Sequence, residues 1–236
     1  MIMKRLENTI PSCDSCTNEK RVFCSLSQLE LGELSLNKKN FQYKKGEEIF
    51  QEGNYPHGLF CIFDGVVKLS KRGNEGKDQI IRFAKPGDIL GYRSMLAKQM
   101  YSTTATAMED VLICQIPIQN FESLLRSSNK LCMKTIELLS NDLKRSENQV
   151  LSVSQKRVAD RLAEALLVLK NKFGLKKDNQ TLDVQITRRE IGEMAGITTA
   201  TTIRTLSDFN KEGIISLKNK EIKLMKITEL ERFASS

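Results

Sequence analysis

The sequence holds a single histidine among its 236 residues. That residue, His57, directly precedes Gly58 and suggests a surface turn. Histidine is the commonest side chain for acid–base catalysis. No pair of carboxylates and no nucleophile with a nearby base compensates for its scarcity. The sequence therefore disfavours an enzyme.

Long hydrophobic runs are also absent. No window holds eighteen apolar residues in succession, and no apolar stretch follows the basic pair Lys4 and Arg5. A membrane-spanning helix and a secretory signal would each require such a run. We therefore expect a cytoplasmic protein with no membrane partner.

Acidic residues are outnumbered by basic ones, 29 to 37, which gives a net charge of +8 and a pI of about 9.2. From Ser154 onward there are 16 lysines and arginines against 11 aspartates and glutamates. A basic surplus favours a polyanionic partner, nucleic acid before an anionic membrane. Hydrophobic residues at 40% and a length sufficient for two domains indicate a globular protein.

Three of the six cysteines lie in an N-terminal arm, residues 1–25, as Cys13, Cys16 and Cys24. In a cytoplasmic protein, cysteines more often bind metal or sense redox state than form disulfides. A Cys-x2-Cys turn directs two thiolates at one metal centre, and Cys24 is near enough in sequence to add a third. The alternative is that all three are ordinary thiols in a loose arm.

Residues 26–128 are expected to form a β-barrel effector domain, in which residues 41–117 alternate short apolar runs with glycines. A short helix capped by Ser25 or Ser27 is predicted first. The expected strands are residues 48–50, 58–63, 66–69, 79–83 and 111–116, with turns at 64–65 and 72–74. Short strands at regular spacing with turn residues between them predict a β sandwich or jelly roll.

A long amphipathic helix is predicted over residues 129–153. Apolar residues recur along it at alternating steps of four and three, with one polar interruption at Ser146. That spacing is typical of a two-stranded coiled coil, so we expect a dimer seam. The helix could instead pack only on its own domain. The central seam residues are Ile136, Leu139, Leu143 and Val150.

Residues 154–236 are predicted to form a winged helix-turn-helix. Ser154 is expected to cap a helix that ends at Phe173. Thr187 and Glu190 then form a capping box, and Gly196 provides a turn to a second helix capped by Thr198 or Thr199. The segment from Ile214 to Met225 can fold back as a hairpin.

This arrangement predicts binding to double-stranded DNA. The first turns of the second helix would enter the major groove. Arg204 is the best candidate to read a base, because a guanidinium can bind guanine O6 and N7 together. Thr187 and Arg188 lie where a phosphate would approach the first helix. The remaining expected contacts are Thr199, Ala200 and Thr201.

The runs 43–53, 58–69 and 86–91, with 182–224, resemble the cyclic-AMP receptor protein and fumarate–nitrate regulator (Crp/Fnr) family of transcription factors. The resemblance implies an α+β protein with a cyclic-nucleotide-binding-like jelly roll, a long dimerisation helix and a C-terminal winged helix-turn-helix. It also implies a homodimer on a palindromic operator and contact with RNA polymerase. Thr202 and Ala200 depart from residues usual in the family, which puts the family's usual operator in doubt.

The two branches of the family differ in their effector. The cyclic-nucleotide branch uses an Arg-Ser pair and a glutamate, whose places fall at Tyr101-Ser102 and near Tyr92, so cyclic AMP is not expected.

The fumarate–nitrate branch holds a [4Fe–4S] cluster on four cysteines, and the resemblance assigns these to Cys13, Cys16, Cys24 and Cys114. It implies sensing of oxygen, nitric oxide or redox state. The wider gap between Cys16 and Cys24 leaves zinc, redox thiols or another effector open. Cys61 and Cys132 are expected to be small core residues.

Overall fold

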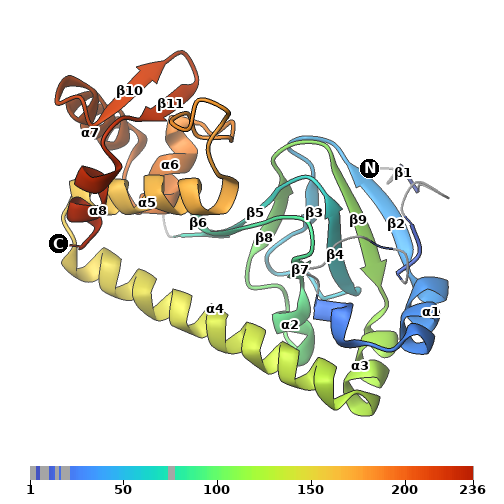
Figure 1. Ribbon diagram of the computed structural model, residues 1–236. Helices are drawn as coiled ribbons and strands as arrows, with labels where there is room; N and C mark the ends of the chain where they lie inside the picture. The colour runs from blue at the N-terminus through green and yellow to red at the C-terminus, as the bar shows by residue number, and fades with distance from the viewer. Residues whose placement is uncertain (1–3, 6–10, 14–15, 17–21, 74–77, 236) are drawn as a thin grey trace. The chain divides into compact units, whose positions relative to one another are not determined.

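The computed structural model describes residues 4–5, 11–13, 16, 22–73 and 78–235 (Figure 1). The chain divides into two compact units, residues 1–72 with 81–143, and residues 73–80 with 144–236. Much of the predicted arm and part of the predicted turn at 72–74 lie outside the described residues. No helix within those ranges is long and apolar enough to cross a membrane.

The first unit is a sandwich of two antiparallel sheets, as predicted. One sheet has the strand order β1-β2-β9-β4-β7 and the other β3-β8-β5-β6. All five predicted strands form, and β1, β2, β7 and β8 are additional. The strands are β1 (Lys4–Arg5), β2 (Lys39–Tyr43), β3 (Glu48–Phe50), β4 (Leu59–Asp64), β5 (Val67–Arg72), β6 (Asp78–Ala84), β7 (Ile89–Leu90), β8 (Thr104–Ala107) and β9 (Val111–Ile116).

One core lies between the two sheets. Alternation along β4 and β9 sends Phe60, Ile62 and Ile113 into it. The ring of Phe50 stacks on the ring of Tyr101 with centroids 4.0 Å apart and on that of Phe60 at 5.7 Å. Aromatic side chains therefore fill this interior.

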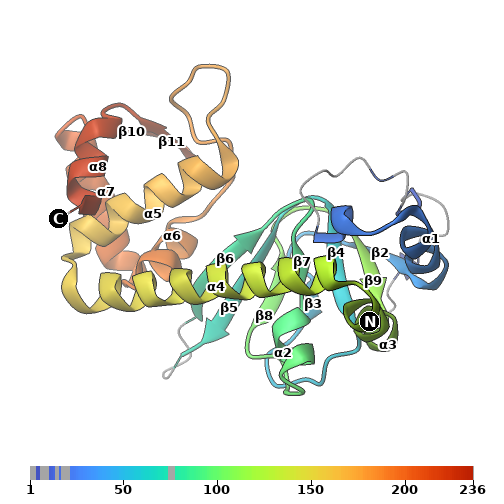
Figure 2. The same ribbon diagram turned by 60° about the horizontal axis from the view of Figure 1, so that its bottom comes forward.

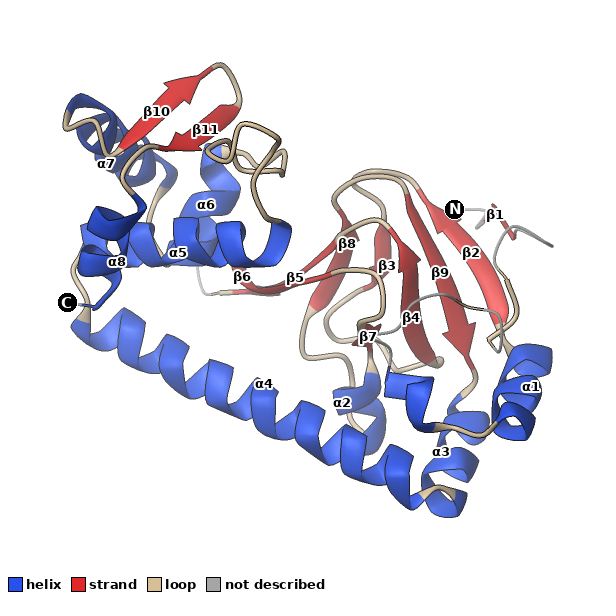
Figure 3. Cartoon of the chain, in the orientation of Figure 1, coloured by secondary structure: helices blue, strands red, loops and turns tan. Residues whose placement is uncertain are grey.

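A second core covers the opposite face of the five-stranded sheet, and we call it the outer core. It joins the sheet to the arm and to the helices, and Figure 3 shows α1 and α3 together at one end of the strands. Ser27 caps α1 as predicted, and its hydroxyl and the Glu30 carboxylate form a capping box. The covering elements are η1 (Val22–Ser25), α1 (Gln28–Asn37), α2 (Tyr92–Leu96), α3 (Ile118–Ser127) and the start of α4 (Asn129–Gln155).

The predicted long helix forms as α4. Its first turns are anchored in the outer core, where Leu131 and Thr135 are buried. The expectation that Ser154 caps the next helix is wrong, because Ser154 is still within α4 and its hydroxyl donates to Leu151 O at 3.1 Å. The cap is instead at Arg157, whose N–H donates to the Asp160 carboxylate at 3.3 Å.

A hydrogen bond ties α4 to α2. The buried Tyr92 hydroxyl donates to Asp142 Oδ2. Burial, and then this bond to a carboxylate, raise the pKa of Tyr92 well above its usual value. We expect Tyr92→Phe to lower the free energy of unfolding by about 1–2 kcal/mol in urea titrations, because a hydrogen bond to a charged group is lost. Tyr55→Phe, at an exposed tyrosine, is the matched control, and equal stability of the two variants would contradict this assignment.

The second unit contains the predicted helix-turn-helix and hairpin (Figure 2). Ile215 pairs with Leu224 at one end of the hairpin and Lys218 with Glu221 at the other. A final helix, absent from the prediction, packs on α5 and brings Phe233 within 5.2 Å of Phe209 between ring centroids. The elements are α5 (Val158–Phe173), α6 (Arg188–Ala195), α7 (Thr199–Lys211), β10 (Ile215–Lys218), β11 (Glu221–Leu224) and α8 (Ile227–Ser235).

Candidate functional site

Side-chain caps fix both helices of the helix-turn-helix. The Thr187 hydroxyl accepts from Glu190 N–H at 3.1 Å, and the Glu190 carboxylate accepts from Thr187 N–H at 2.9 Å. Gly196 ends α6 with φ of +64°, a conformation that glycine adopts without strain. The Thr198 hydroxyl then accepts from Thr201 N–H at 3.2 Å and begins α7. The predicted capping box, turn and cap are thereby confirmed.

The two helices approach closely at Gly192. A Cβ added there would lie 2.6 Å from Thr202 Oγ1 and 2.9 Å from Ile197 O. Thr202 is completely buried, and its hydroxyl donates to Thr198 O at 2.9 Å. The backbone of its own helix thus satisfies the buried hydroxyl of Thr202.

Most of the predicted DNA contacts lie on the surface of the second unit. Burial lowers the pKa of Arg188, although arginine stays a cation in proteins. The structure places the six predicted DNA contacts at the start of α6 and in the first turns of α7. The side chains of Thr187, Thr199, Ala200 and Arg204 are exposed, and those of Arg188 and Thr201 are half-buried.

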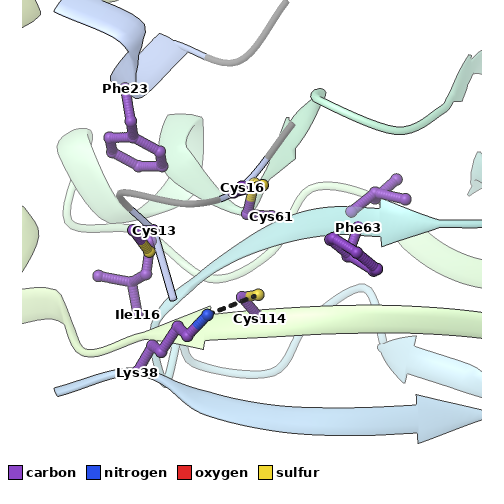
Figure 4. A pocket seen from close by; sticks show the side chains of 9 residues that line it. Cys13, Cys16, Phe23, Lys38, Cys61, Phe63, Cys114 and Ile116 are labelled. Carbon is purple, nitrogen blue, oxygen red and sulfur yellow. Dashed lines mark hydrogen bonds between the residues drawn. The ribbon is translucent and has the colours of Figure 1, made fainter. Parts of the chain in front are cut away.

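In the first unit, four cysteines line one small cavity on the outer face of the five-stranded sheet (Figure 4). Two come from the arm and two from strands β4 and β9. Cys13 and Cys114 are buried, and Cys16 and Cys61 are half-buried. Phenylalanine and isoleucine side chains form most of the remaining wall. The full lining is Cys13, Cys16, Phe23, Lys38, Cys61, Ile62, Phe63, Cys114 and Ile116.

Lys38 is the cation of this cavity and was not identified from the sequence. Its ammonium lies 3.9 Å from Cys114 Sγ and also donates to Pro11 O in the arm. Burial raises the pKa of the Cys114 thiol to about 11, and the charge of Lys38 opposes that rise. Cys114 is therefore a neutral thiol at neutral pH, and a metal would have to displace its proton.

Only three of the four predicted cluster ligands line the cavity. Cys24 lies on η1 and is exposed, whereas its neighbour Phe23 is buried and lines the cavity. Among the described residues, no three histidine, cysteine, aspartate or glutamate side chains are gathered closely enough to hold a single metal ion. The assignment of Cys24 as a ligand remains a prediction.

The donor set nevertheless has the chemistry of a cluster site. Four thiols is the number that a [4Fe–4S] cluster requires, and the wall is otherwise largely apolar. The cavity measures about 20 Å³, room for about one water molecule. A cluster therefore requires the arm to lie farther from the sheet. The arm is held here by hydrogen bonds that include Cys13 N–H to Ser35 Oγ and Lys38 Nζ to Pro11 O.

The position expected for a cyclic-nucleotide phosphate is occupied by aromatic packing. Tyr101 is 2% exposed, with its ring stacked on Phe50. The Tyr101 hydroxyl accepts from His57 N–H at 3.4 Å and lies 3.5 Å from Gly58 O. This side chain offers a cyclic phosphate no positive charge.

The predicted seam residues of α4 are largely solvent-exposed in the single chain. Ile136 is 49% exposed, Leu143 61% and Val150 68%, at steps of seven residues. Leu139 is half-buried, since it also packs against the outer core. An apolar stripe thus runs along a helix whose first turns are anchored in the outer core.

Comparisons with known protein families agree with the fold of both halves of the chain. Residues 40–128 match the cyclic nucleotide-binding domain family, and residues 160–233 match the Crp-like helix-turn-helix domain family. The chain is 31% identical over 208 residues to electron transport regulator A of Shewanella oneidensis, covering 88% of this chain and 82% of that one. It is 30% identical over 224 residues to the fumarate and nitrate reduction regulatory protein of Vibrio cholerae, covering 89% and 88%.

Among solved structures, FixK2 from Bradyrhizobium japonicum is similar, with a TM-score of 0.73 at 22% identity. The similarity covers 84% of this chain and 98% of that one. At such identity the likeness concerns the fold, and it agrees with a sandwich, a long helix and a helix-turn-helix in one chain.

Proposed function

The chain belongs to the Crp/Fnr family of transcription regulators, and its similarity to a fumarate and nitrate reduction regulatory protein extends over most of its length. On this basis we propose that it acts as a homodimer on a palindromic operator. We further propose that an iron–sulfur cluster makes this binding respond to oxygen, nitric oxide or redox state. Contact with RNA polymerase is part of the same proposal and rests on the family alone.

The DNA-binding half of the proposal is supported by the division of α7 into two faces. Thr202, Leu206 and Phe209 are buried against the rest of the unit. The exposed face carries Arg204 in the second turn after the Thr198 cap, where a helix in the major groove meets base edges. The guanidinium of Arg204 can bind guanine through two parallel hydrogen bonds. The N-terminus of α6, beside Thr187, can bind a DNA phosphate through its backbone N–H groups.

The homodimer is supported by the exposed stripe of α4. Ile136, Leu143 and Val150 fall at one heptad position, and exposing three such side chains to water is unfavourable. A second copy of α4 would cover them. Pairing two copies would place two recognition helices about 34 Å apart, one turn of DNA.

The sensing half is supported by the continuity of the outer core. Cys13 and Phe23 of the arm share this core with Leu131 of α4, and Leu139 of the seam packs against it. When bound, an iron–sulfur cluster would supply a thiolate-held centre that oxygen or nitric oxide degrades. Release of the arm would remove buried side chains from the core beneath α4 and so alter the support of the seam.

The role of Arg204 can be tested by two substitutions. Arg204→Ala is expected to weaken specific operator binding about 5- to 150-fold, the equivalent of about 1–3 kcal/mol for one bidentate base contact. Arg204→Lys keeps the charge and should still lose most of the discrimination. Binding is measured by gel shift against specific and scrambled duplexes. Arg232→Ala, at an exposed arginine on α8, is the control, and equal losses in both variants would exclude base reading by Arg204.

The whole proposal is tested by purifying the protein under nitrogen. We expect a brown protein with iron and acid-labile sulfide, dimeric, which binds a palindromic duplex and loses binding in air. A colourless protein with zinc or no metal that still binds DNA would refute the cluster and leave the regulator. Failure to prefer any duplex over scrambled DNA would refute the regulator itself.

A further inference from the structure

We propose that Cys61, rather than Cys24, supplies the fourth thiolate, so that the ligands are Cys13, Cys16, Cys61 and Cys114. The inference rests on the proposed cluster function and changes which residues carry it. It departs from the sequence-based assignment, in which Cys61 was a core residue and Cys24 a ligand.

The register of two neighbouring strands carries the first part of the argument. Cys61 on β4 is directly opposite Cys114 on β9. Directly opposed residues share a face of the sheet, with Cβ atoms about 4.5–5.5 Å apart. That face is the outer one, because the flanking pair Leu59 and Ile116 belongs to the outer core. A rigid sheet therefore presents two thiols side by side to the arm.

The arm brings the other two thiols to the same place. Cys13 is buried in the outer core, and Cys16 lines the cavity with Cys61 and Cys114. Figure 4 shows the four side chains reaching the cavity from the arm, β4 and β9. Cys13 and Cys16 both line the cavity from the arm, as Cys61 and Cys114 do from the sheet, so two pairs of thiols share one space.

The placement of Cys24 argues against its taking part. Phe23, the preceding residue, is 2% exposed and meets the Phe121 ring edge-on at 6.1 Å between centroids. Turning η1 so that Cys24 faces the cavity would pull the Phe23 ring out of the outer core. Replacing a buried aromatic side chain by a thiol there is unfavourable.

Lys38 favours a cluster at this location over one displaced toward η1. Four thiolates held together carry a large negative charge, which a cation at 3.9 Å from Cys114 Sγ partly balances. Lys38 also donates to Pro11 O, two residues before Cys13. It is thus a positioning residue for both the strand and the arm.

The test compares serine variants purified under nitrogen from cells grown without oxygen. Iron, acid-labile sulfide and visible absorption are measured for Cys61→Ser, Cys24→Ser and Cys132→Ser. We expect Cys61→Ser to lose at least tenfold in iron, and Cys24→Ser and the control Cys132→Ser to keep wild-type iron. Retention of iron by Cys61→Ser, or its loss from Cys24→Ser, would overturn the inference. Wild-type protein without iron would instead refute the proposed function.

A second readout avoids the question whether Cys61→Ser folds. Wild-type protein is alkylated under nitrogen with its cluster and after removal of the iron by a chelator, and the modified cysteines are identified by mass spectrometry. Cys61 and Cys24 both have exposed surface in the structure, so both are expected to react without iron. With iron, Cys61 should be protected and Cys24 should react as before; protection of Cys24 alone would contradict the assignment.

Discussion

Replacing Leu143 with glutamate is expected to leave the protein monomeric and to weaken operator binding about 10³-fold or more, toward the level of non-specific binding. Leu143 is 61% exposed and lies midway along the apolar stripe of α4. In a two-stranded coiled coil it would meet its own copy, so the variant would bury two carboxylates against each other. A monomer would reach one half-site only. Mass is measured by sedimentation equilibrium and binding by gel shift.

Leu151→Glu is the matched control for this prediction. Leu151 lies on the same helix and is 53% exposed, but it falls outside the heptad positions of Ile136, Leu143 and Val150. The control should therefore stay dimeric and bind the operator. A dimeric Leu143→Glu variant, or a monomeric wild-type protein under every condition, would disprove the seam.

Replacing Gly192 with alanine is expected to abolish specific DNA binding and to destabilise the second unit by about 1–3 kcal/mol. The added methyl group would lie 2.6 Å from Thr202 Oγ1 and 2.9 Å from Ile197 O. The backbone oxygen cannot rotate away, and Thr202 is held by its bond to Thr198 O. The helices must separate, so α7 would no longer be presented at a fixed angle.

Gly32→Ala provides the comparison, because Gly32 also lies inside a helix and a Cβ there meets nothing within 4 Å. That variant should be as stable as the wild type or more so, by roughly 0.5–1 kcal/mol, since alanine favours helix. Urea unfolding followed by circular dichroism, with gel shifts, measures both effects. Intact DNA binding by Gly192→Ala would show that the close approach is dispensable.

Much of the fold could be predicted from the sequence because its signals are local. The capping box at Thr187, the turn at Gly196 and the alternating apolar residues of residues 111–116 depend only on near neighbours. Ser154 was misassigned for the same reason. A serine before a helix is usually a cap, but here α4 runs on to Gln155 and the next helix has Arg157 at its N-cap.

The thiol cavity could be predicted only in part. Cysteine spacing brought Cys13 and Cys16 together, and the resemblance added Cys114. Cys61 and Lys38 join them through strand register and through the packing of α1, both of which depend on contacts between distant segments. A single shift of register would turn Cys61 to the opposite face of the sheet.

The half-buried Leu139 connects folding within one chain to assembly between chains. It packs against the outer core from a position that the heptad pattern also assigns to the seam. In the proposed dimer, the part of the Leu139 surface that is buried in the outer core of its own chain cannot also contact the neighbouring subunit. The association constant of the proposed dimer should therefore vary with how deeply Leu139 is seated in the outer core, which makes the strength of dimerisation a graded quantity.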